Sequence, residues 1–160
     1  MILLGIDPGF ADMGYGIISL EGGKDRCLDY GSIRTPVGTS MAARLALVYD
    51  RLADLIDRYH PDAAAIEKLF FSKNVKTALL VAEARGVIRA CLEKHGVRCQ
   101  EFSPAEVKIA VCGHGGAKKD EVQKMVKILL GLENIPEPDD AADALALALA
   151  FAHTRIPANR

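Results

Sequence analysis

The chain has 160 residues, of which 50% are apolar and 26% are charged, and its formal net charge at pH 7 is −1. This length is typical of one domain and this composition of a globular protein, which excludes disorder, collagen-like repeats and coiled coil as the main description. No apolar run reaches the roughly 18 residues that a membrane-spanning helix needs.

Three strand signals open the chain. Residues 2–6 form a short apolar run, residues 15–20 form a second, and residues 27–34 form a third. The glycine-containing segment 21–25 between the second and third runs is a hairpin turn signal. Because the links between these strands are short, we expect an antiparallel meander.

The rest of the chain alternates helical periodicity with short apolar runs. These patterns predict further strands over 63–67 and 97–102, and helices over 40–59, 75–95, 103–113, 119–130 and 139–154. Parallel strands need crossover connections, and the helices supply them. We therefore predict an α/β fold in which helices flank a mixed five-stranded sheet, with three antiparallel strands followed by parallel ones. A single domain is expected over 1–155, with a short C-terminal tail over 156–160.

Export from the cell is not indicated. The first residues, MILLGID, lack the basic region and the cleavage site of a signal peptide. Cys27, Cys91, Cys99 and Cys112 show no CxxC spacing. Reduced thiols in a cytoplasmic protein with no membrane partner are therefore expected.

Basic residues concentrate between residues 68 and 130. This segment holds twelve Lys and Arg against six Asp and Glu, a net charge of +6, so the remainder carries −7. One interpretation is a basic face that binds a polyanion beside an acidic pocket. The other is ordinary charge scattered over solvated helices.

Four acidic residues stand among apolar neighbours at the ends of predicted elements. Asp7 follows the first strand, Glu67 ends the fourth, and Asp140 and Asp143 share one face of the last helix. Taken singly, each has a structural explanation, as a turn residue, a strand-end residue that points to solvent, or a residue of the first helical turn.

Convergence of these four carboxylates would require cations, because like charges at close range repel strongly. Oxygen ligands without His or Cys favour Mg²⁺ or Mn²⁺ over Zn²⁺. Two such ions about 4 Å apart clamp the attacking and leaving oxygens of a phosphodiester, so that water attacks and no nucleophilic side chain is needed. The acidic set therefore indicates two-metal hydrolysis of a nucleic acid.

Four segments together carry a family resemblance over nearly the whole chain. They are GIDPG at 5–9 with the glycines that follow it, AIEKLFFSKN at 65–74, AEARG at 82–86 and DAADALALALA at 140–150. In this order and spacing they resemble the RuvC family of Holliday junction resolvases. The resemblance implies an RNase H-like fold and structure-specific, Mg²⁺-dependent cleavage of a four-way DNA junction by paired nicks, in recombination and repair. It also implies two ions per active site, with Mn²⁺ as a substitute.

The resemblance assigns roles to the acidic residues. Asp7 is similar to the first-strand ligand that bridges both metal ions, and Glu67 to the catalytic glutamate of the family. Asp140 and Asp143 are similar to its final acidic pair.

It also assigns roles in DNA binding. Lys108 and Lys119 fall where the family has lysines near the active site, and Lys118 adjoins Lys119, so that either fits this role. Phe70 falls where the family has an aromatic residue that contacts junction bases, which suits stacking. Lys73 and Lys76 are expected to contact the DNA backbone, the alternative being solvated helix charge.

A homodimer is implied too, because two nicks on symmetric strands need two active sites, and so is action with the RuvA–RuvB branch-migration complex. The small residues Ala78, Ala82, Gly86 and Ala90 lie at four-residue spacing on the second predicted helix. Small side chains permit close approach, either of the twofold mate, which we expect, or of the sheet.

Three other functions stay open at this stage. The first is an RNase H-like nuclease that acts on another branched or hybrid nucleic acid. The second is an actin-like ATPase or sugar kinase, but those proteins need two lobes. The third is a junction-binding protein without catalysis, against which four carboxylates beside phosphates argue.

Overall fold

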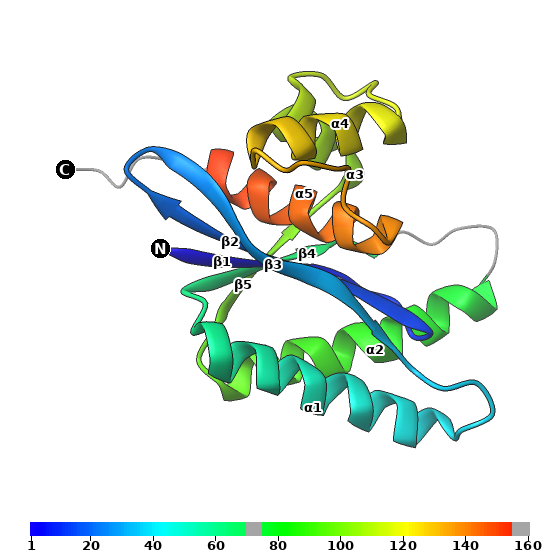
Figure 1. The fold of residues 1–160 in the computed structure, drawn as a ribbon. Coiled ribbons are helices and arrows are strands. Elements are labelled where there is room, and N and C mark those ends of the chain that lie inside the picture. The colour runs from blue at the N-terminus through cyan, green and yellow to red at the C-terminus, as the bar shows by residue number, and fades with distance from the viewer. Residues whose placement is uncertain (70–74, 155–160) are drawn as a thin grey trace.

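A twisted five-stranded sheet lies between two layers of helices (Figure 1). The computed structural model describes residues 1–69 and 75–154. The strands are β1 (Ile2–Asp7), β2 (Asp12–Glu21), β3 (Lys24–Arg34), β4 (Ala63–Glu67) and β5 (Arg98–Phe102). The helices are α1 (Met41–Tyr59), α2 (Val75–Lys94), α3 (Pro104–Cys112), α4 (Lys119–Leu129) and α5 (Asp139–His153). The predicted order of elements is confirmed, but β2 begins earlier than predicted, because its ladder with β3 extends to Asp12.

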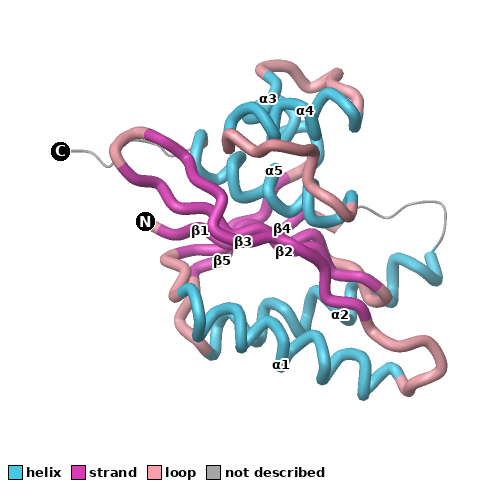
Figure 2. The backbone as a smooth tube through the Cα atoms, in the orientation of Figure 1, coloured by secondary structure: helices cyan, strands magenta, loops and turns pink. Residues whose placement is uncertain are grey.

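The strand order is β3-β2-β1-β4-β5. The pairs β1–β2 and β2–β3 are antiparallel, whereas β1–β4 and β4–β5 are parallel. The crossovers between the parallel strands contain α1 and α2 (Figure 2). The predicted mixed sheet is therefore confirmed, with β1 at its centre.

The two faces of the sheet carry different helices. Helices α1 and α2 cover one face, and α5 lies on the other with α3 and α4 stacked outside it (Figure 1). Side chains alternate between the faces, so Leu4 and Ile6 of β1 pack in the α1–α2 cluster, whereas Leu3 packs in the α5 cluster. Helix α5 contacts all five strands and is buried on almost every side, which explains why its sequence is apolar all round.

Glycines in β1 and β2 let α5 lie directly on the sheet. A Cβ at Gly5 would collide with the carbonyl oxygen of Ala144. One at Gly16 would stand 2.7 Å from the Leu145 side chain, and one at Gly14 would meet the backbone of Asp140. This close approach brings the N-terminal end of α5 to the carboxyl end of β1.

The described part of the chain contains no helix long and apolar enough to cross a membrane. All four cysteines are free thiols, as expected. Burial raises the pKa of Cys27 and of Cys91 to about 11 in each case, so these two thiols are protonated and unreactive at neutral pH.

Candidate active site

Strand register places the first two acidic residues side by side. In the parallel pair β1–β4, Ile6 is opposite Ile66, so Asp7 and Glu67 follow at adjacent strand ends. Alternation along the strands turns both side chains to the α5 face, since Ile6 and Ile66 pack on the opposite one. Ligand sites of α/β sheets form at the carboxyl ends of the strands, and both residues lie there.

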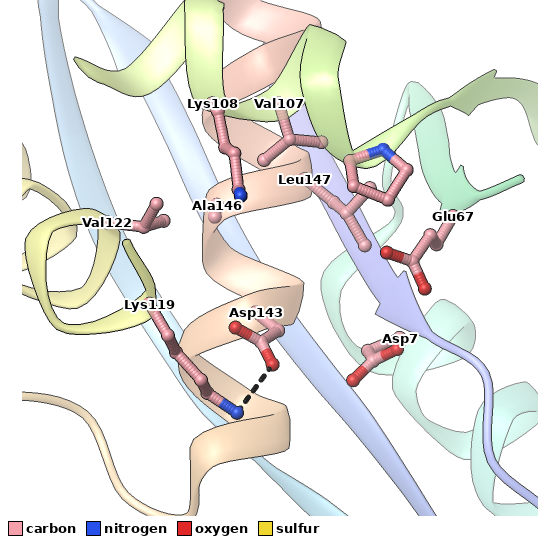
Figure 3. Close-up of a pocket in the computed structure, with 10 residues that line it drawn as sticks. Asp7, Glu67, Val107, Lys108, Lys119, Val122, Asp143, Ala146 and Leu147 are labelled. Carbon is pink, nitrogen blue, oxygen red and sulfur yellow. Dashed lines mark ion pairs between the residues drawn. The ribbon is translucent and has the colours of Figure 1, made fainter. Parts of the chain in front are cut away.

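Helix α5 supplies the third carboxylate across from these strand ends. Asp7, Glu67 and Asp143 line one pocket of about 250 Å³, together with Lys108 and Lys119 (Figure 3). Apolar side chains from α3, α4 and α5 complete its wall, among them Val107, Val122 and Leu147. The pocket is therefore acidic at its base, basic at one side and otherwise apolar.

Asp140 lies one turn earlier on α5 and does not line this pocket. Its backbone rests over Gly14 of β2. Its negative charge nevertheless contributes to raising the pKa of Asp7. The structure thus gathers three of the four predicted carboxylates around one pocket and places the fourth beside it.

The carboxylates disfavour one another's ionisation. Burial, followed by the charges of Glu67 and Asp143, raises the pKa of Asp7 to about 7. Burial and then Asp143 raise the pKa of Glu67. The pKa values of Asp140 and Asp143 are also raised, mainly by burial. Such a set retains its full negative charge at neutral pH only with a compensating cation.

Lys119 supplies part of that positive charge. Its Nζ lies 3.2 Å from Asp143 Oδ2 and 3.0 Å from Asp139 Oδ2. Partial burial lowers the pKa of Lys119, but Asp139 and Asp143 outweigh it and the net shift is upward. Lys118 precedes α4 as its N-terminal cap residue and is exposed outside the pocket. Of the two adjacent lysines, Lys119 is therefore the one at the site.

A divalent cation fits the donor chemistry of this pocket, because its acidic groups are all oxygen donors with raised pKa values. In the positions described, however, no three Asp, Glu, His or Cys side chains stand close enough to hold one ion. The Asp143 carboxylate is instead paired with Lys119 through one of its two oxygens. Coordination of one ion by three of these groups would require the carboxylates to turn towards a common point.

The other predicted site residues have separate outcomes. Phe70 and Lys73 lie outside the described residues. Lys76 is exposed in the first turn of α2 and does not line the acidic pocket. A functional candidate that the sequence reasoning did not single out is Arg85, which lies within the AEARG segment and whose guanidinium donates to the backbone carbonyl of Glu67.

The small-residue stripe of α2 does not pack on the sheet along its length. Ala78 is buried and Ala82 is half-buried, but Gly86 and Ala90 are exposed. A Cβ at Gly86 would meet no atom within 4 Å. The sheet-contact interpretation therefore fails for the second half of the stripe.

The fold and the position of the acidic residues define a class of protein. A mixed sheet in this strand order, with carboxylates at the ends of β1 and β4 and on the helix across them, is the arrangement of RNase H-like nucleases. The family model for crossover junction endodeoxyribonuclease RuvC matches residues 3–153. The chain belongs to the RuvC family.

Individual relatives agree over the same range. A crossover junction endodeoxyribonuclease RuvC from Heliobacterium modesticaldum is 49% identical over 154 residues, which cover 96% of this chain and 95% of the relative. The RuvC structure of Thermus thermophilus is 35% identical with a TM-score of 0.90, over 96% of this chain and 94% of that one. T. thermophilus RuvC in complex with Holliday junction substrate is 35% identical with a TM-score of 0.91, over 96% of this chain and 93% of that one.

Proposed function

We propose that this chain is an endonuclease that resolves Holliday junctions by divalent-metal-dependent phosphodiester hydrolysis, in homologous recombination and DNA repair. The observation that carries the proposal is the pocket in which Asp7, Glu67 and Asp143 meet Lys108 and Lys119, in a chain of the RuvC family. The T. thermophilus relative that has been solved with a Holliday junction substrate supports this substrate class.

The acidic residues would hold the metal. Asp7, Glu67, Asp140 and Asp143 offer only oxygen donors, which suits two Mg²⁺ ions, with Mn²⁺ as a substitute. When bound, these ions supply positive charge against the attacking and leaving oxygens of the phosphodiester. Because burial and neighbouring carboxylates raise the pKa of Asp7 to about 7, metal binding near neutral pH displaces protons. Cleavage should therefore become faster as the pH rises through 7.

The lysines of the pocket would act on the phosphate. Lys119 is held at the pocket wall by Asp139 and Asp143. From this position the Lys119 ammonium would offset the negative charge that develops on the scissile phosphate in the transition state. Lys108 lines the same pocket from α3 and would neutralise the phosphate from the side opposite the sheet.

Residues outside the pocket would bind the arms of the junction. Lys76 and Lys118 are exposed, and each is proposed to contact a backbone phosphate, which gives affinity without sequence readout. Lys73 is proposed to act in the same way and Phe70 to stack on a junction base. Stacking of this kind contributes about 1–3 kcal/mol per base.

A homodimer that contacts through the exposed half of the α2 stripe would supply the second active site. Gly86 and Ala90 are exposed there without large side chains, which supports a close helix contact. Sedimentation at micromolar concentration should show a dimer, and a monomer would contradict this part of the proposal. Action with the RuvA–RuvB complex and a cytoplasmic location remain predictions from family resemblance.

Cleavage of an immobile four-way junction with Mg²⁺ tests the central proposal. A matched duplex and a matched RNA–DNA hybrid are the comparison substrates, and Asp7→Asn is the test variant. Asp54→Asn is a matched control, because Asp54 is exposed on α1, across the sheet from the pocket. Paired nicks confined to the junction, absent in Asp7→Asn and retained in Asp54→Asn, are expected.

The alternatives predict different results in the same assay. Cleavage of the hybrid in place of the junction would keep the metal site and overturn the substrate. Junction binding without nicks, even with Mn²⁺, would favour a binding protein without catalysis. Loss of junction binding by a folded Asp7→Asn protein would contradict the role given to Asp7.

A further inference from the structure

Among residues 1–69 and 75–154, Arg85 is the only charged residue that is buried, with 7% of its surface exposed. It lies on α2, within the AEARG segment, and no step of the proposed cleavage uses it. An Arg is rarely buried unless its donors are paired. The partners of Arg85 therefore indicate what its burial achieves.

Both arms of the guanidinium are engaged at the end of the sheet. One arm, Nη1, donates to the backbone carbonyl of Glu67, the last residue of β4. The other, Nη2, donates to Glu101 Oε1 on β5 at 2.9 Å. Arg89 reaches the same Glu101 oxygen at 3.2 Å, but its side chain is 63% exposed and no contact between it and Glu67 is described.

The strand register shows what these two bonds connect. Glu101 is opposite Ile66, and Glu67 is opposite Phe102. Alternation turns Glu101 to the α2 face and the Glu67 side chain to the α5 face, where the acidic pocket lies. Arg85 therefore lies on the face of the sheet opposite the pocket. From there it hydrogen-bonds to the backbone of Glu67, whose carboxylate projects towards the pocket.

Lys68, the residue that follows Glu67, is held by two described contacts. The amide of Lys68 donates to the carbonyl of Phe102 at 2.8 Å, and Lys68 Nζ pairs with Glu106 at 3.0 Å. Because β4 ends at Glu67, the backbone carbonyl of Glu67 lies at the junction between the strand and the following loop. A donor at that carbonyl limits rotation of the peptide plane and so limits the directions that the side chain can take.

We propose that Arg85 is a positioning residue for Glu67, which holds the end of β4 against β5 so that the Glu67 carboxylate faces Asp7 and Asp143 across the pocket. This inference rests on the proposed role of Glu67 in cleavage. An arginine suits the task because its planar fork presents donors in two fixed directions, whereas a lysine ammonium on a flexible stem does not reproduce that geometry.

The experiment compares Arg85→Gln and Arg85→Lys with the control Arg89→Gln, which removes the other cationic partner of Glu101 and leaves the Glu67 carbonyl bonded. Three quantities are measured on the whole protein. They are the single-turnover cleavage rate on saturating four-way junction, the dissociation constant for the junction without metal, and the calorimetric affinity for Mn²⁺ without DNA.

Both Arg85 variants should lose cleavage rate and Mn²⁺ affinity by about 10- to 100-fold, the usual effect of removing a group that orients a metal ligand. Junction affinity should stay within about threefold, because Arg85 is buried and offers no charge to a phosphate. Arg89→Gln should match the parent in all three measurements. Cleavage and Mn²⁺ affinity close to those of the parent in folded Arg85 variants would overturn the inference.

A purely structural role and a failure of the proposed function are told apart by two further variants. If neither Arg85 variant folds, Glu101→Gln is used instead, because it weakens the bond that Arg85 makes to β5. This variant should also have a lower cleavage rate and a lower Mn²⁺ affinity than the parent. Values equal to those of the parent would overturn the inference. Glu67→Gln tests the function beneath it. Full cleavage by Glu67→Gln would overturn the role of Glu67, and an inactive Glu67→Gln beside a fully active Arg85→Gln would overturn the positioning role alone.

Discussion

The contact between Gly5 and α5 gives a direct test of how the active site is assembled. In Gly5→Ala, the new Cβ would collide with the carbonyl oxygen of Ala144 and lie 2.8 Å from the amide nitrogen of Ala148. Carbon atoms of this kind essentially never approach within 3.0 Å of such neighbours. Both obstacles are backbone atoms of a buried helix, so neither can swing aside, and α5 itself has to lift from the sheet.

The energetic cost follows from that movement. Overpacking a well-packed core costs about 1–3 kcal/mol, and we expect about 3 kcal/mol because a helix backbone, not a side chain, must yield. In a domain of this size each kcal/mol lowers the melting temperature by about 2–4 °C, so Gly5→Ala should melt about 6–12 °C lower. Lifting α5 also carries Asp143 away from Asp7, and cleavage should fall on the order of 100-fold.

Thermal unfolding by circular dichroism and single-turnover cleavage measure the two effects. Gly115→Ala is the matched control, because a Cβ there would lie 3.7 Å from the Ile109 side chain, an ordinary contact. The control should melt within about 2 °C of the parent. A Gly5→Ala protein that also melts within about 2 °C of the parent would refute the argument that α5 rests directly on β1.

Three further predictions concern the pocket and the α2 surface. Without divalent ions, Asp7→Asn should stabilise the protein at pH 8 by up to about 4 kcal/mol, because burial and neighbouring carboxylates raise the pKa of Asp7 to about 7. Between about pH 4 and pH 7 the folded parent holds a proton that the unfolded chain has released, so its stability falls as the pH rises through this range, and a pH-independent difference in melting would contradict this. Lys119→Met should slow cleavage by about 10²- to 10³-fold, whereas Lys118→Met should only weaken junction binding slightly; equal effects would place both at the phosphate. Gly86→Ala should remain folded, since its Cβ meets open space, yet sediment as a weaker dimer, and an unchanged dimer would move the interface elsewhere.

The predictions from sequence that proved accurate rest on local patterns. The helix predicted over 103–113 begins with a capping box, in which Ser103 Oγ accepts from the Glu106 amide and the Glu106 side chain accepts from the Ser103 amide. The helix predicted over 139–154 forms over Asp139–His153, and its apolar residues are buried on almost every side. In each case a few consecutive residues specify both the conformation and the burial, so no distant contact has to be known.

The features that the sequence did not reveal depend on which distant residues meet. The need for a glycine at position 5 follows from the close approach of the Ala144 backbone, which the sequence does not reveal. The pairing of Lys119 with Asp143 likewise depends on the packing of α4 beside α5. Lys118 and Lys119 are adjacent in sequence, yet one caps α4 and the other opens its first turn. Hydrophobic periodicity specifies which face of a helix is buried but not what packs against it. The ion pair between Asp143 and Lys119 could therefore not be predicted without the fold.

The order of the pocket residues along the chain also bears on how the enzyme is made. Asp7 lies on the first strand and Asp143 on the last helix described, so almost the whole domain is synthesised between them. Until α5 has left the ribosome, one face of the sheet is uncovered and Asp7 has neither its acidic neighbours on α5 nor Lys119 held by Asp143. We therefore expect a partly synthesised chain to be unable to nick DNA, so that nuclease activity begins only when folding is nearly complete.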